Sequence, residues 1–98
     1  MSDDLIEYSR EMGLTHSDFW RLLPRAMGEH PYTVKGDTVE ASVHHGSLII
    51  HLGPTQERKI ALLNIPFSVV SFRFEGVEKE QQMAFKTHFD LHFQRGGG

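Results

Sequence analysis

The feature that most constrains this chain is a strict alternation of apolar and polar residues near its middle. The apolar positions are Val39, Ala41 and Val43 in one segment, then Leu48, Ile50 and Leu52 in the next. A period of two places each set on one face of a β-strand. The two segments are therefore predicted to form a hairpin with one buried face.

The turn of this hairpin is predicted at residues 45–46. A two-residue loop there pairs Val43 with Leu48 and places Glu40 opposite His51 on the other face. A carboxylate beside an imidazole raises the basicity of the ring and fixes its tautomer, as a general-base dyad requires. The alternative is an ordinary exposed pair, since no nucleophile or cleft can be assigned beside it.

Two helices are predicted before the strands. The first spans 2–12, with Ser2 as its N-cap and Gly13 as its stop; its apolar positions are Leu5, Ile6, Tyr8 and Met12. The second begins near Thr15, where Thr-x-x-Asp resembles a capping box. Pro24 should kink or shorten this second helix, because proline has no backbone N–H to donate.

A third helix is predicted over 77–95. Phe85, Phe89 and Phe93 recur at intervals of four residues, which lines one side of a helix. The run 88–93 also alternates like a strand, but the phenylalanine spacing favours the helix.

Further strands are predicted at 32–35, 58–65 and 68–75. If Pro66-Phe67 forms the turn between the last two, Leu63 faces Val70 and Ala61 faces Phe72. Alternatively, Pro66 sits at a bulge in one bent strand.

The predicted fold class is α+β. A four- to five-stranded antiparallel meander carries two N-terminal helices and one long C-terminal helix. Residues 1–95 are expected to form a single domain, and 96–98 a disordered glycine tail.

Composition excludes several classes of function. The chain has no cysteine, which rules out disulfides, thiolate zinc sites and thiol nucleophiles. Its formal net charge of −3 disfavours nucleic acid and anionic lipid as partners. The N-terminus is acidic and no long apolar run follows, so we expect a cytoplasmic protein without a membrane partner. No cofactor is expected.

The histidines are the candidate ligands. His88 and His92 stand four residues apart, so both point to the same side of the predicted third helix, a spacing that helical metal sites use. The alternative is two imidazoles packed against aromatic neighbours, because no third ligand is fixed by the spacing.

Surplus apolar residues are predicted on the face of the sheet opposite the first set. The candidate binding residues there are Ile49, His51, Ile60, Leu62, Val69 and Arg73. Large aliphatic side chains on a face that is normally polar imply a cover, which is either the N-terminal helices or another molecule.

The resulting functional prediction is a non-enzymatic protein-binding or assembly module, with self-association as a homodimer, and no catalytic residue is assigned. The alternative is a small ligand- or metal-binding protein or minor enzyme, using Glu40 and His51 or His88 and His92.

Overall fold

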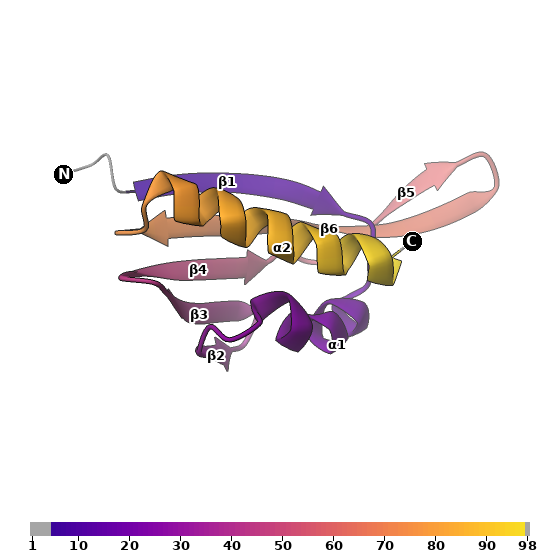
Figure 1. Ribbon diagram of the computed structural model, residues 1–98. Helices are drawn as coiled ribbons and strands as arrows, with labels where there is room; N and C mark the ends of the chain where they lie inside the picture. The colour runs from indigo at the N-terminus through magenta and orange to yellow at the C-terminus, as the bar shows by residue number, and fades with distance from the viewer. Residues whose placement is uncertain (1–4, 98) are drawn as a thin grey trace.

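The structure, a computed structural model, describes residues 5–97, with side chains from Glu7 to Phe93 (Figure 1). The elements in chain order are β1 (Leu5–Met12), α1 (His16–Met27), β2 (Tyr32–Lys35), β3 (Thr38–Val43), β4 (Gly46–Leu52), β5 (Gln56–Ile60), β6 (Leu63–Glu75) and α2 (Lys79–Gly97). The predicted α+β class with an antiparallel sheet is confirmed. The one-domain division at 1–95 with a tail at 96–98 stays a prediction, and Gly98 lies outside the described residues.

The six-stranded sheet has the order β1-β6-β4-β3-β2, and β5 pairs with β6. β5 continues the ladder that β4 begins, since Leu52 pairs with Val70 and Gln56 with Phe67. Both helices lie on the same side of the sheet (Figure 1). The molecule therefore has two layers, and the opposite side of the sheet carries no helix of the described chain.

The prediction of a helix over 2–12 is wrong, because residues 5–12 form β1. This strand pairs with β6 from Leu5–Glu75 to Met12–Ser68. Tyr8 and Met12 face the helices, while Glu7 and Glu11 are exposed on the other side. The described residues thus contain two helices where three were expected, and six strands where four or five were expected. The predicted cap at Ser2 lies outside the described residues.

The second predicted helix is confirmed as α1. The hydroxyl of Thr15 accepts a hydrogen bond from the backbone N–H of Asp18 at 3.1 Å, as an N-cap does. Pro24 does not shorten α1, which continues to Met27. Gly28 follows with a φ of 62°, a conformation that favours glycine.

The hairpin is confirmed, but its register differs from the prediction. Val43 pairs with Gly46, so the turn is His44-His45 rather than 45–46. A Cβ on Gly46 would lie 2.3 Å from the carbonyl oxygen of Glu75, so glycine serves the close approach of β4 and β6. His44 then takes the left-handed conformation, with φ 55°. The shift is two residues, and the predicted face stays buried.

The turn predicted at Pro66-Phe67 is wrong. The alternative of one continuous strand is confirmed, but Pro66 pairs with Glu57 in regular register rather than at a bulge. β6 runs unbroken through Pro66, and the turn lies at Ala61-Leu62, where Ile60 pairs with Leu63. The pairings of Leu63 with Val70 and Ala61 with Phe72 are therefore absent. Proline is tolerated because this part of β6 lies beyond the end of β1 and pairs with β5 alone.

The core is aromatic. Phe72 of β6 meets Phe89 of α2 edge to face with ring centroids 5.1 Å apart, and Phe74 meets Phe85 likewise at 5.8 Å. Phe85, Phe89 and Phe93 are all buried, so the predicted stripe on the long helix is confirmed.

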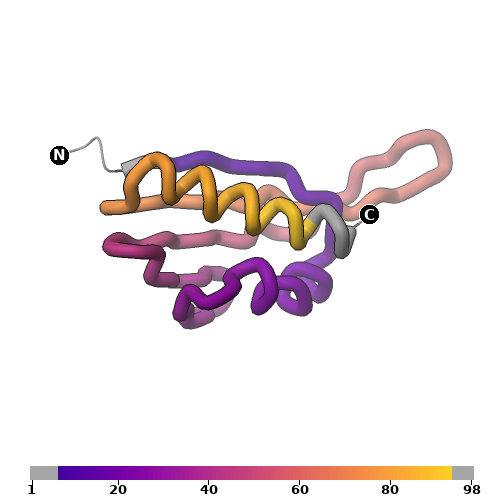
Figure 2. The backbone as a smooth tube through the Cα atoms, viewed as in Figure 1, coloured from indigo at the N-terminus to yellow at the C-terminus, as the bar shows by residue number. Residues whose placement is uncertain are grey.

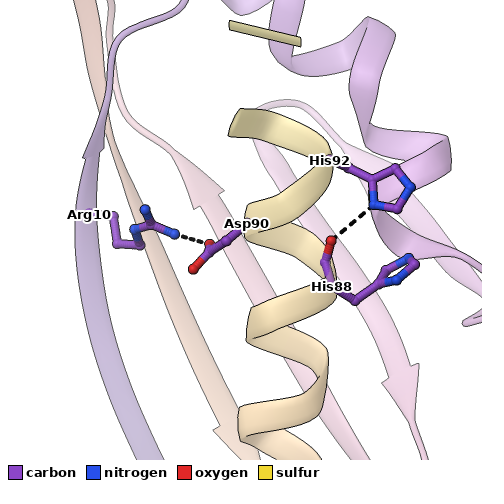
Figure 3. A network of polar contacts seen from close by, with 4 residues as sticks. All are labelled: Arg10, His88, Asp90 and His92. Carbon is purple, nitrogen blue, oxygen red and sulfur yellow. Dashed lines mark hydrogen bonds and ion pairs between the residues drawn. The ribbon is translucent and has the colours of Figure 1, made fainter. Parts of the chain in front are cut away.

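Polar contacts attach β1 to α2. Arg10 forms an ion pair with Asp90 (Figure 3). The ammonium of Lys86 lies 4.4 Å from the centroid of the Tyr8 ring, a cation–π geometry. Burial raises the pKa of Tyr8 to about 12, partly opposed by the charge of Arg10. These contacts lie on the helical side of the sheet.

Candidate binding surface

Residues 56–67 form a two-stranded arm that projects beyond the sheet and past both helices (Figure 2). β5 and the first part of β6 make this arm, and they pair through five residues each. The molecule is consequently elongated, with principal-axis extents of 48 × 26 × 25 Å. The arm is the structural feature that the sequence analysis did not predict.

One face of the arm is apolar. The register places on it Ile60, Leu63, Ile65 and Phe67, which we name the arm strip. Ile60 is 52% exposed, Leu63 64% and Ile65 38%, and Leu62 in the turn is 100% exposed. The other face carries Glu57, Lys59 and Asn64. An exposed apolar cluster backed by a polar face is typical of an interaction surface.

The two residues in the turn at the end of the arm, Ala61 and Leu62, are not residue types that favour a turn. Ala61 has a φ of 56°, in the left-handed region where a Cβ costs about 1 kcal/mol and glycine or asparagine is preferred. The next residue, Leu62, exposes its whole side chain, although burying a leucine contributes about 1.5–3 kcal/mol. Local turn stability therefore does not explain an Ala-Leu turn at this position.

A cation lies at the base of the arm strip. The guanidinium of Arg58 is centred 4.6 Å from the centroid of the Phe67 ring and forms an ion pair with Glu11 at 2.6 Å. Arg58 pairs with Ile65 and Glu11 pairs with Val69, so this ion pair bridges the arm and the sheet along one face. The arm strip is thus continuous with the side of the sheet that has no helix.

We name that side the outer face. Its apolar members are Ile49 and Val69, both partly buried; its hydroxyls include Thr38, Ser42, Ser47 and Ser71; its carboxylates are Glu7, Glu11, Glu40 and Glu75. Since α1 and α2 both pack on the opposite side, the interpretation that N-terminal helices cover this face is wrong. Because these hydroxyl side chains are short, another molecular surface could come close to the outer face.

The six predicted binding residues are divided between two regions. Ile49, His51, Val69 and Arg73 lie on the outer face, and Ile60 lies on the arm strip. Leu62 lies in the turn of the arm. The sequence pattern placed all six residues on one face of the sheet. Ile60 and Leu62 are not on that face, because the pattern did not predict the turn at 61–62.

Glu40 and His51 are not directly opposite each other. Glu40 pairs with Ile49, and His51 pairs with Thr38, whose hydroxyl lies 3.5 Å from its Nδ1. Glu40 instead forms an ion pair with Lys35 at 3.4 Å. Both side chains are exposed, so the predicted dyad is not formed.

His88 and His92 do lie together, with ring centroids 4.4 Å apart (Figure 3). Nδ1 of His92 donates to the carbonyl oxygen of His88 at 2.9 Å, and Nε2 of His88 donates to that of Arg25 at 3.3 Å. One nitrogen of each ring is thereby used in a structural hydrogen bond. Among residues 7–93, no three His, Asp or Glu side chains gather closely enough to hold a metal ion.

Two other histidines meet near this pair. The ring of His30 lies 5.6 Å from those of both His44 and Phe85. Burial, and then the neighbouring charges of His44 and His88, lower the pKa of His30, while Glu29 opposes the shift. Sequence spacing did not identify this cluster because its members come from different elements.

Comparison of the chain with family models, curated proteins and solved structures finds no match. Neither helix of the described residues is long and apolar enough to span a membrane.

Proposed function

We propose that this protein is a non-enzymatic, cytoplasmic protein-binding module that docks a partner protein through the arm strip. The observation that carries the proposal is the combination of Ile60, Leu63 and Ile65 on one exposed face with a fully exposed Leu62 at the tip. Transferring such side chains from water into an interface supplies about 25 cal/mol for each Å² of apolar area buried.

The polarity of the two arm faces supports a directional contact. Ile65 and Asn64 are consecutive residues of β6 that point to opposite faces of the ribbon. Only one face can bury apolar area, whereas Lys59 and Glu57 on the other remain hydrated. A protein surface of complementary shape would cover the first face and leave the second in water.

Arg58 and Lys59 also control the exposed edge of the arm. Unpaired strand edges promote aggregation, and charged residues on them, lysine above all, suppress it. An arm that keeps its apolar face yet protects its edge in this way fits specific docking better than accidental exposure.

Photo-crosslinking in cells tests the proposal. A benzophenone amino acid placed at Ile65 should yield covalent protein adducts of defined mass, whereas the same group at Asn64, one residue away on the polar face, should yield few or none. Equal labelling from both positions, or none from either, would contradict docking through the arm strip.

A further inference from the structure

We propose that His88 and His92 form a binding site for one divalent metal ion of the late first row, copper(II) above nickel(II) and zinc(II). The two residues stand one turn apart on α2, on the side of this helix that meets the end of α1 (Figure 3). The side chain of His88 is exposed and that of His92 is partly buried, so solvent ions reach the pair. The site is separate from the arm strip and does not depend on the proposed function.

Hydrogen bonds determine which nitrogen of each ring carries the proton. Nδ1 of His92 donates to the carbonyl oxygen of His88 at 2.9 Å, and Nε2 of His88 donates to that of Arg25 at 3.3 Å. Since a carbonyl oxygen only accepts, the neutral rings carry their lone pairs on Nε2 of His92 and Nδ1 of His88. A histidine that ligates a metal almost always donates its other ring N–H in this way, which fixes the tautomer and the orientation of the ring.

The separation of the two rings suits neighbouring ligands of one ion. A metal–nitrogen bond of about 2.0–2.1 Å places the centroid of an imidazole ring about 3.2 Å from the metal. The centroids of His88 and His92 are 4.4 Å apart, so they would subtend about 90° at an ion equally distant from both. Neighbouring ligands make this angle in the tetragonal geometry that copper(II) and nickel(II) prefer with nitrogen and oxygen donors.

The end of α1 restricts the ring of His88. Gly28 follows α1 directly, and a Cβ on this residue would lie 3.4 Å from Nε2 of His88. The ring is therefore held between Gly28 and the carbonyl oxygen of Arg25. A side chain that is already held in place loses less conformational entropy on binding, which favours affinity.

The donor atoms select the class of metal. Within residues 7–93, no third His, Asp or Glu side chain joins the pair, so the protein contributes two imidazole nitrogens and water completes the coordination. Calcium and magnesium prefer carboxylate and carbonyl oxygens, and this pair offers neither a carboxylate nor a free carbonyl. Imidazole suits zinc, nickel and copper, and divalent copper binds most tightly in this series.

The neighbouring positive groups leave the pair open to a cation. The ammonium of Lys86, two residues before His88, lies over the ring of Tyr8 on the β1 side of α2. The side chain of Arg25 is exposed, so water and salt screen its charge. Burial lowers the pKa of His30, so this ring adds no positive charge near His88 at neutral pH.

Isothermal titration calorimetry of the purified full chain with copper(II), nickel(II), zinc(II) and magnesium chlorides tests the proposal. We expect one tight site per chain, tightest for copper(II), and no binding of magnesium. His88→Gln and His92→Gln should each weaken copper binding at least tenfold, because the second ligand of a chelate binds intramolecularly. His51→Gln, the matched control at an exposed histidine of β4, should leave the Kd within about twofold.

Electron paramagnetic resonance of the copper complex identifies the donors. The spectrum should show two histidine nitrogens in the wild type and at most one in either single variant. A rescue variant guards against a merely structural effect: residue 84 is exposed and lies one turn before His88, so Ala84→His added to His92→Gln should regain part of the lost affinity. Circular dichroism of each variant confirms that it is folded.

Three results would overturn the proposal. The first is a wild-type chain that binds no copper(II) at about 1 mM metal. The second is unchanged affinity in both His88→Gln and His92→Gln, which would place the bound metal elsewhere. The third is the absence of any gain from Ala84→His, which would show that a pair of histidines one turn apart on this face of α2 does not suffice.

Discussion

Replacing Phe89 by alanine should be among the most destabilising single changes in this protein. Phe89 is 1% exposed and lies against three aromatic rings, those of Phe72, Phe85 and Phe93, at centroid distances of 5.1, 5.7 and 4.5 Å. Truncating a buried phenylalanine costs about 3–5 kcal/mol. A domain of this size is stable by about 5–15 kcal/mol, so Phe89→Ala should remove a large part of the free energy of unfolding.

Leu91→Ala is the matched control, since Leu91 is two residues away and 47% exposed. It should change the free energy of unfolding by less than about 1 kcal/mol, which is usual for a half-exposed position. Urea unfolding followed by circular dichroism measures both variants. The pair also tests the helix: in a strand over 88–93, residues 89 and 91 would share one face, so a similar loss from both variants would refute the assignment of α2.

Three further effects follow from local geometry. The pKa of His30 is lowered in the folded protein, whereas the unfolded chain has a histidine pKa of about 6.5. As the pH falls below about 6.5, the unfolded chain takes up a proton that the folded protein does not, so the folded protein loses stability. The urea midpoint should therefore drop less with falling pH in His30→Gln than in wild type. Gly53→Ala should lower the unfolding midpoint, because a Cβ there would lie 2.7 Å from the carbonyl oxygen of Val69, whereas Gly13→Ala should be tolerated, its nearest such atom being 4.0 Å away. Ala61→Gly should slow hydrogen exchange in the arm by relieving about 1 kcal/mol of strain at φ 56°, and faster exchange would contradict that account.

The sequence predicted those elements whose pattern is long and whose period is unambiguous. The alternation from Val39 to Leu52 identified the hairpin and its buried face. The spacing of Phe85, Phe89 and Phe93 identified α2, and Thr15 identified the start of α1. In each case the signal lies within one element, where neighbouring residues determine the periodicity.

The segment 5–12 shows where local pattern fails. Its Leu5, Ile6, Tyr8 and Met12 fit a helical stripe as well as a strand, because Arg10 interrupts the alternation. The structure resolves the ambiguity through β6, which pairs with all eight residues of β1, and through Asp90 of α2, which pairs with Arg10. Both partners lie more than 55 residues away in sequence, so their contribution is not visible in the segment itself.

The candidate binding surface, too, was predicted from the sequence only in part. The sequence by itself determined that the chain has more exposed apolar residues than one sheet face can bury, and it named Ile49, Ile60, Leu62 and Val69 among them. Only the tertiary structure decided that both helices share one side of the sheet, that the turn falls at 61–62 and that β6 continues past Pro66 into an arm. The physical reason is that a period reports which residues share a face, whereas the cover of that face depends on distant elements competing to bury it.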